Sequence, residues 1–423
     1  MPPGPGPGGV GSPRGVLGLV EFRALAAAGL LSAVGDQVAR VALSVLVFDR
    51  TSSALLTALT YALTFLPAVI GAPLLSGLAD RRPRRQLMVG LDLIRAALVA
   101  AMAVPGLPLP ILLALLVVVN VAESPFDGAR AALVPDITGD RYLAAVVVDR
   151  TLHQLAQVLG FAGSGLLLLV VSPTSALLAD AVSFAGSAVL IRRWIGHRPA
   201  AVPGARAGGG WVGRGRRGLA DGAVGIGAIW SDPRVRRAVM LTWVVATFAI
   251  IPEGLAAPYA RQLTGGAALV ALLLAANPIG NVLGGIAAAR WSRRHPDRLV
   301  APLAQLVVVP LAVCGLDPPR AVAVTLIAVS GLGVAVELFA RSVFVAHIPP
   351  AVRGRAFGVA GAGLIISQGL AVAAAGVAAS VFAPSAVIGA AGVLGAATIT
   401  VLLATTRTTR TTRTTHPPRP SPD

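Results

Sequence analysis

Long apolar runs dominate the chain, and short turns carrying proline, glycine or arginine separate them. From near Arg23 onward the runs recur at lengths of about 18 to 26 residues. A bilayer core about 30 Å thick needs about 20 helical residues per crossing, so each run is long enough to span a membrane. The twelve predicted spans cover residues 24–48, 54–79, 86–104, 109–129, 146–171, 174–195, 236–258, 266–289, 299–316, 321–343, 356–381 and 384–404.

The spans fall into two groups of six. We therefore predict an all-α polytopic membrane protein with an N-terminal six-helix bundle at 21–195 and a C-terminal six-helix bundle at 236–404. Between them, residues 196–235 are rich in glycine and arginine and are expected to form a solvated cytoplasmic linker. Residues 1–20 and 405–423 contain no span, and we expect both to be disordered tails, the second of them basic.

The two halves also echo each other in sequence. The pair Arg23-Ala24 before the first span matches Arg237-Ala238 before the seventh, and Ala129-Arg130 after the fourth matches Ala340-Arg341 after the tenth. These pairs are 214 and 211 residues apart. A nearly constant offset predicts two pseudo-symmetric bundles, which in transporters place a binding site between the halves near the membrane midplane.

Composition adds an orientation. The chain has 423 residues, 55% of them hydrophobic, with a formal net charge of +17, and all 35 basic residues are arginine. With a cytoplasmic N-terminus, 30 arginines fall in cytoplasmic segments and three in outward loops. We therefore expect a multi-pass cell-membrane protein with both termini inside. Its arginine-rich face would attract anionic lipid head groups, and we expect no nucleic-acid partner.

The reactive residue types limit the chemistry. Without lysine the chain has neither a phosphate-loop lysine nor a Schiff-base lysine, and its one cysteine, Cys314, cannot form an internal disulfide or a thiolate metal cluster. The histidines have no metal-ligand spacing, and neither an HExxH motif nor a nucleophile elbow is present. We expect no enzymatic activity, no cofactor and no metal.

The loop between the second and third predicted spans carries a family resemblance. Residues 76–85 read SGLADRRPRR, which resembles the loop signature of the major facilitator superfamily, although Ser76 and Pro83 stand where glycine is usual. A degenerate copy at 285–294 keeps the arginines and has Ala289 in place of the acid. The resemblance implies a cytoplasmic gating loop that latches the two halves; the alternative is that these residues only fix topology. The loop residues concerned are Asp80, Arg81, Arg84 and Arg85.

Further segments resemble one branch of that superfamily, the exporters related to the enterobactin exporter and the macrolide efflux proteins. They include Gly35-Asp36 in the first span, the run 92–96 in the third and the run 180–184 in the sixth. The resemblance implies a monomeric secondary transporter that exports a drug, siderophore or secreted metabolite by proton-coupled alternating access. For Asp180 it implies a packing or hydrogen-bonding role.

Ionisable residues within the spans need partners or a function, because each costs about 2.5–3.5 kcal/mol at the membrane centre. Asp36 and Arg40 lie four residues apart on one helix face, so they form either a self-neutralising pair or a site where Asp36 titrates or meets a cationic substrate. Asp92 and Arg95, three apart, are expected to form a supporting ion pair near the cytoplasmic end.

Four more acids are candidates for proton coupling or substrate binding. Glu123 and Asp127 are like charges four apart, an arrangement that favours proton binding; alternatively, Asp127 pairs with Arg130. Glu253 has no base at helical pairing distance, so it faces the substrate or lies at the outer rim. Glu337 is followed four residues later by an arginine.

Glycines mark two further helices. Gly160, Gly163 and Gly165 resemble the glycine motif of drug antiporters, but Phe161 stands where that motif has proline. Gly280 and Gly284 lie four apart in the eighth span. We expect these glycines to serve in helix packing or as hinges. Because the antiport motif is incomplete, import or facilitated diffusion remains an alternative, as does a non-transporting sensor or scaffold with the same fold.

Overall fold

The computed structural model describes residues 13–65, 82–198, 222–291 and 296–411, and its secondary structure there is helical. The N-terminal half contains α1 (Pro13–Leu17), α2 (Val20–Thr51), α3 (Ala54–Ala62), α5 (Arg84–Met102), α6 (Leu109–Thr138), the short 3₁₀ helix η1 (Gly139–Arg141), α7 (Tyr142–Val170) and α8 (Pro173–Trp194).

The C-terminal half begins with an interrupted helix and continues with longer ones. Its elements are α10 (Pro233–Ala249), α11 (Ile251–Gly254), α12 (Ala256–Gln262), α13 (Ala267–Trp291), α14 (Pro296–Cys314), α15 (Arg320–Gly333), α16 (Val336–His347), α17 (Pro350–Ala378) and α18 (Pro384–Thr411).

Nine helical segments in the described ranges are long and apolar enough to cross a membrane. α10 with α11 forms one of them, and α15 with α16 forms another. α5 and α14 occupy the third and ninth predicted spans but are not among the nine: α5 carries four charged residues, and the apolar part of α14 is short. The second predicted span is described only over α3. An all-helical, multi-span membrane protein is thereby confirmed.

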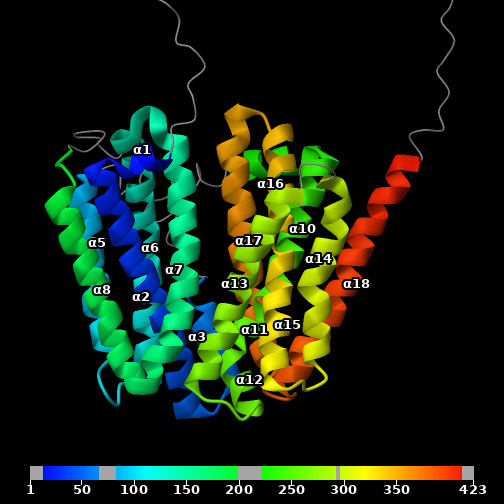
Figure 1. Ribbon diagram of the computed structural model, residues 1–423, viewed down its shortest axis with the longest axis horizontal. Coiled ribbons are helices and arrows are strands. Elements are labelled where there is room, and N and C mark those ends of the chain that lie inside the picture. Colours follow the sequence, from blue (N-terminus) through cyan, green and yellow to red (C-terminus); the bar gives the residue numbers. More distant parts are fainter. Residues whose placement is uncertain (1–12, 66–81, 199–221, 292–295, 412–423) are drawn as a thin grey trace, which may run out of the picture.

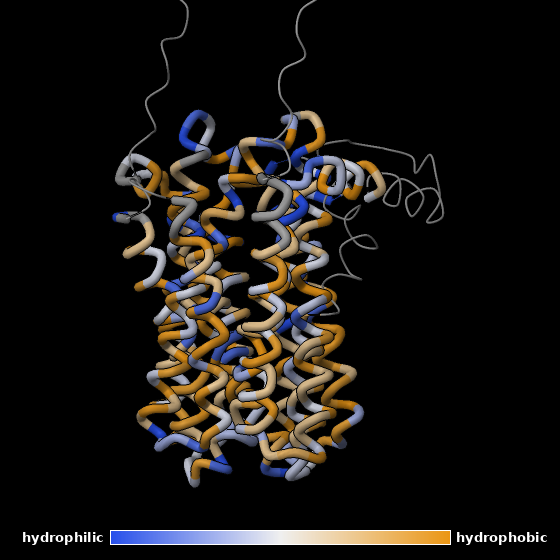
Figure 2. The backbone as a smooth tube through the Cα atoms, turned by 90° about the vertical axis from the view of Figure 1, so that its right-hand side faces the viewer, coloured by the Kyte–Doolittle hydropathy of each residue, from blue (hydrophilic) through white to orange (hydrophobic). Residues whose placement is uncertain are grey.

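The helices assemble into two bundles that stand side by side (Figure 1). In the first, α2 packs on α7 and α8, while α5 packs on α6 and α8; in the second, α15 packs on α13 and α14, and α14 on α18. Apolar residues run along the length of the helices, and hydrophilic segments gather at both ends (Figure 2). This pattern matches bundles that stand upright in a bilayer.

Three helical segments extend into regions predicted to be tails or linker. α1 lies within the first 20 residues, and its Val16 is fully buried against the N-terminal bundle. The helix Gly222–Ser231 lies within the predicted linker and buries Ile229 against α10 and α16. α18 continues to Thr411. An apolar side chain close to a bundle end can gain burial there, which favours a helical turn over solvated chain.

The two halves contact each other at the end of the molecule opposite α1 and the last turns of α18 (Figure 1). There one buried apolar cluster combines residues of both halves, including Val41 and Ala58 with Ile250 and Leu274. In the described part of the chain, each of the other buried clusters belongs to one half alone. We call the end where the two halves contact each other the closed end.

Small residues bring the helices together at the closed end. A Cβ atom added at Gly165 of α7 would lie 2.8 Å from the Cβ of Ala271 on α13, and one added at Gly376 of α17 would lie 2.5 Å from the Cβ of Ala58 on α3. Both contacts cross between the halves. Close backbone approach through glycine therefore builds the inter-half seal.

Candidate functional site

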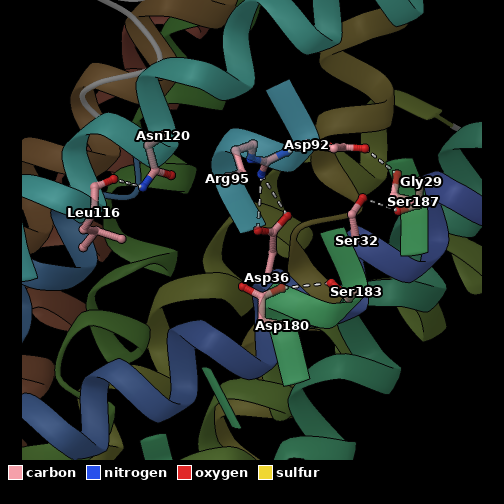
Figure 3. Close-up of polar contacts among 10 residues, drawn as sticks. All are labelled: Gly29, Ser32, Asp36, Asp92, Arg95, Leu116, Asn120, Asp180, Ser183 and Ser187. Carbon is pink, nitrogen blue, oxygen red and sulfur yellow. Dashed lines mark hydrogen bonds and ion pairs between the residues drawn. The ribbon is translucent and has the colours of Figure 1, made fainter. Parts of the chain in front are cut away.

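A buried charged cluster lies halfway along the N-terminal bundle, where α2, α5 and α8 meet (Figure 3). Nη2 of Arg95 donates to both carboxylate oxygens of Asp36, at 3.4 Å each. Nη1 of Arg95 lies 3.9 Å from Oδ1 of Asp92. Arg95 is 3% exposed and Asp92 is fully buried, so a guanidinium and its carboxylates sit together in the membrane interior.

Two serine hydroxyls of α8 orient carboxylates of this cluster. Ser187 donates to Oδ2 of Asp92 at 2.7 Å, and Ser183 donates to Oδ1 of Asp180 at 3.1 Å. Gly35 makes room for Ser183 and Asp180, because a Cβ atom at position 35 would collide with the Ser183 hydroxyl and the Asp180 carboxylate. The absence of a side chain at position 35 thus lets the polar face of α8 approach α2.

Aromatic rings complete the surroundings of Arg95. Its guanidinium carbon lies 4.1 Å from the ring centroid of Phe184 and 5.9 Å from that of Phe126. Rings at these distances attract a cation through their negative faces. Even so, Nε of Arg95 and Oδ1 of Asp92 have no hydrogen-bond partner among the described residues, so the cluster is incompletely bonded.

The ion-pair partner of Asp36 in the structure differs from the one that its spacing along the helix predicts. Asp36 contacts Arg95 of α5 rather than Arg40 on its own helix, and the Arg40 guanidinium lies 5.5 Å from the Phe65 ring centroid. Asp92 and Arg95 do approach each other, at the long distance given above. The alignment of three helices, which sequence spacing does not report, decides the partner of Asp36.

A small cavity adjoins the cluster and has room for a few water molecules. It is too small for an organic substrate. Its polar lining consists of Asp36, Arg40, Thr64, Asn120, Glu123 and Asp180.

The predicted carboxylate pair on α6 is without direct partners. Neither Glu123 nor Asp127 makes a hydrogen bond or ion pair with another described residue. Arg130 instead forms an ion pair with Asp149 of α7, so the alternative pairing of Asp127 with Arg130 is not seen. Asp127 is exposed within a membrane-crossing helix. Since an acid facing lipid is costly, we infer that Asp127 faces water between the halves.

Glu253 lies at the closed end rather than in an open cavity. The Tyr61 hydroxyl of α3 donates to its Oε2 at 2.5 Å, which joins two residues from opposite halves. Tyr61 is 2% exposed. Glu253 belongs to α11, the short turn where the helix is interrupted on either side of Pro252. At the same end, Arg261 and Asp49 form an exposed ion pair that also joins the halves.

The remaining charged candidates lie apart from the cluster. Arg84 bonds to the carbonyl of Ala132 at 2.9 Å and pairs with Asp136, and Arg85 donates to the carbonyl of Arg192. These contacts tie α5 to its neighbours within one half. Asp80 and Arg81 lie outside the described residues. Glu337 on α16 forms no ion pair with another described residue.

The predicted glycines differ in their surroundings. A Cβ atom at Gly160 would meet Gln37 of α2 at 2.6 Å, whereas at Gly163 it would meet nothing within 4 Å. On α13, a Cβ atom at Gly280 would collide with the carbonyl of Ala328, and one at Gly284 with that of Leu332, both on α15. Gly160, Gly280 and Gly284 therefore sit at tight helix contacts, while Gly163 faces open space.

Some residues of the site were not identified from sequence. The serines of α8 follow Asp180 at positions i+3 and i+7, so their shared helical face was a usable signal. Tyr61 gave no signal, because its partner is 192 residues away along the chain. Within the described ranges, no group of three or more histidine, cysteine, aspartate or glutamate side chains is arranged to hold a metal ion.

Comparison with known proteins identifies the fold and family. The family model of the Major Facilitator Superfamily matches residues 25–257, more than half of the chain. No curated protein sequence matches significantly.

Solved transporter structures share the fold. The nucleoside transporter NupG (D323A mutant) is 14% identical with a TM-score of 0.71, covering 90% of this chain and 99% of that one. The peptide transporter POT in complex with sulfate is 16% identical with a TM-score of 0.70, covering 93% and 97%. A POT family transporter in complex with 5-aminolevulinic acid is 12% identical with a TM-score of 0.70, covering 94% and 97%.

Identities this low establish the fold and not the substrate, whereas the family model establishes membership. The two helical bundles, joined at one end and carrying buried charges inside, agree with it. The chain belongs to the major facilitator superfamily, whose members are secondary transporters of small molecules rather than enzymes.

Proposed function

We propose that this chain is a proton-coupled exporter of a small organic molecule, within the exporter branch that its sequence resembles. One observation carries the proton coupling: carboxyl groups outnumber guanidinium groups in the middle of the N-terminal bundle. The carboxyl groups are Asp36, Asp92, Glu123, Asp127 and Asp180, and the guanidinium groups are Arg40, Arg95 and Arg130.

The imbalance grows when ion pairs are considered. Arg130 is paired with Asp149, outside this set, so two arginines remain for five carboxyl groups. Uncompensated charge is costly in the membrane interior. Bound protons relieve that cost, and a carrier that binds and releases protons within its bundle can couple their movement to that of a substrate.

The contacts between the halves support alternating access. Tyr61 with Glu253 and the apolar cluster join the halves at the closed end, whereas buried clusters stay within each half elsewhere. If the end of the molecule that carries α1 and the last turns of α18 lies on the cytoplasmic side, as the arginine distribution predicts, this arrangement is the one expected of an inward-facing state. Substrate would then enter between the halves from the cytoplasm and leave when the closed end opens. The predicted latch of Asp80 and its neighbouring arginines would hold the opposite, outward-facing state.

The substrate is proposed as a drug, siderophore or secreted metabolite. The names of the similar solved transporters mention nucleosides, peptides and 5-aminolevulinic acid, all of which are small organic molecules. A small organic substrate for this chain agrees with them. Asp127 is exposed and has no hydrogen-bond or ion-pair partner among the described residues, which favours a positively charged group on the substrate. We further propose that the protein acts as a monomer and that its arginine-rich face binds anionic lipid.

A transport screen tests this proposal. Cells with and without the protein are exposed to a panel of drugs and secreted metabolites, and retention is measured before and after a protonophore collapses the proton gradient. We expect lower retention of at least one compound in expressing cells, and a rise when the gradient is lost. Export that continues unchanged without a gradient would contradict proton coupling.

Purified protein in liposomes decides between the alternatives. Outward flux driven by an opposing proton gradient supports export, and flux that follows only the substrate gradient would indicate facilitated diffusion. Inward accumulation would indicate import. A correctly folded protein that moves none of the panel would point to a sensor or scaffold instead. These alternatives are tested because Phe161 stands where the glycine motif of drug antiporters has proline, so the antiport motif is incomplete.

A further inference from the structure

Asp180 belongs to the same cluster as Asp36 and is the more deeply buried of the two. Asp180 is 1% exposed, while the Asp36 side chain is 25% exposed. Within the described part of the chain, Ser183 is the one residue that forms a hydrogen bond with it, at 3.1 Å. A single hydroxyl donor is little compensation for an ionised carboxylate in a membrane interior.

Arg95 cannot neutralise every acid around it. A guanidinium has five N–H donors, yet Arg95 makes only two long bonds, both to Asp36, and its buried Nε has no partner among the described residues. Asp36 and Arg40 from α2 and Glu123 from α6 line the same cavity as Asp180, and Arg95 from α5 is paired with Asp36. On α5, Asp92 also faces Arg95.

The charge on α6 adds to this excess. Glu123 of that helix lines the cavity together with Asp36, and Asp127 follows four residues later on the same helix. If every one of these groups were ionised, negative charges would clearly outnumber positive ones. A bound proton within the cluster removes that penalty at small structural cost.

Access to water selects which carboxyl groups take part. Asp36, Glu123 and Asp180 all line the small cavity, so a water molecule there can deliver a proton to each of them. Asp92 is not part of the lining and receives the Ser187 hydroxyl at 2.7 Å. The contact between α2 and α8 brings two of these acids together, because a Cβ atom at Gly35, next to Asp36 in the sequence, would collide with Oδ1 of Asp180. Figure 3 draws Asp36, Asp180 and Arg95 in this cluster.

We propose that Asp36 and Asp180 hold one exchangeable proton between them, with Arg95 as the positioning residue that keeps Asp36 in place. In this pair one carboxyl group donates to, or yields its proton to, the other, and the cavity water exchanges it with solvent. Asp180 thereby has a function beyond packing. The role of this proton in transport rests on the proposed proton-coupled export, but its presence at the pair does not.

Infrared spectroscopy tests the pair without a known substrate. The purified full-length chain is reconstituted in phosphatidylcholine vesicles, and the stretching band of protonated carboxyl groups is followed from acidic to alkaline pH. We expect one component that disappears as the pH rises. Asp180→Asn and Asp36→Asn should each alter that same component, and the double variant should lose one component rather than two. Glu337→Gln, an acid in the other half, is the matched control and should leave it unchanged.

One further variant keeps the test decisive. Ser183→Ala removes only the hydroxyl that contacts Asp180, so it should move the pH midpoint of the component even if the aspartate variants fold poorly. Spectra of Asp180→Asn and Ser183→Ala that superimpose on the wild type at every pH would overturn the proposal, as would loss of two separate components in the double variant.

Comparison with the transport screen separates the two proposals. Gradient-dependent export together with an unaltered Asp180→Asn spectrum would refute the shared proton and leave proton-coupled export standing. Gradient-independent transport together with an altered spectrum would refute the coupling and leave the proton site standing.

Discussion

Replacing Tyr61 with phenylalanine removes one hydroxyl group that joins the two halves at the closed end. In the structure this hydroxyl donates to Glu253 at 2.5 Å, and the tyrosine is almost fully buried. Because Tyr61 and Glu253 belong to opposite halves, this bond can form only while the two halves are in contact at the closed end. Tyr61→Phe is therefore expected to favour the state in which that end is open.

The size of the effect follows from the bond. A hydrogen bond contributes about 0.5–1.5 kcal/mol, or about 1.5–3 kcal/mol when one partner is charged, and losing it leaves the partly buried Glu253 without its tyrosine donor. We therefore expect a loss of about 1–3 kcal/mol for the closed-end contact. This corresponds to a population shift of about 5- to 150-fold.

Distance measurements between spin labels read out this shift. Val104 and Leu316 are exposed residues in turns of the two halves at the closed end, and cysteines placed there carry the labels. The distance distribution should move toward longer values in Tyr61→Phe. Tyr259→Phe is the control, since Tyr259 is equally buried in the same apolar cluster but its hydroxyl has no hydrogen-bond partner among the described residues. An unchanged distribution in Tyr61→Phe, or an equal shift in the control, would refute the reasoning.

Three more predictions concern contacts described above. Arg261→Gln breaks the exposed ion pair with Asp49, which contributes only about 0–1 kcal/mol, so the same label distances should move less than in Tyr61→Phe; an equal or larger movement would contradict this ranking. Gly165→Leu places a side chain against Ala271, so the closed end should open and transport should fall, whereas Gly163→Ala, which faces open space, should have neither effect. Arg95→Ala leaves Asp36 and Asp92 without their cation and should cost about 3–5 kcal/mol, seen as a lower unfolding temperature of the purified protein; an unchanged temperature would show that the acids are already neutral.

The fold could be predicted from sequence because hydrophobic length reports membrane crossing directly. α5 illustrates where this signal weakens: its four charged residues lower its hydropathy, yet they are part of the reason that it packs inside the bundle. The seventh span contains Pro252 and Pro258, but its division into α10, α11 and α12, with breaks near Ile250 and Leu255, could not be located from the sequence. Local chain geometry depends on the neighbours that satisfy the freed backbone groups.

The sequence indicates which residues belong to the candidate site, but it does not indicate which of them form ion pairs or hydrogen bonds with each other. Membrane acids stand out in any apolar run, so Asp36, Asp92 and Glu253 were identifiable at once. Their partners come from other helices: Arg95 reaches Asp36 from α5, and Tyr61 reaches Glu253 from the other half. Spacing along one helix predicts only i+3 and i+4 neighbours, and tertiary packing outweighs them here.

The placement of the charged cluster within a single bundle has a consequence for how motion and charge can be linked. In the proposed alternating access each half moves as a unit, and α2, α5 and α8 belong to the same half. Rocking of one half against the other would then leave the distances among Asp36, Asp92, Arg95 and Asp180 intact. What the motion alters is which side of the membrane supplies water to their cavity. During the conformational cycle, the side of the membrane from which water reaches the cluster would thus change, while the contacts within the cluster stay the same. The hydrogen bond between Tyr61 and Glu253, by contrast, would break when the closed end opens.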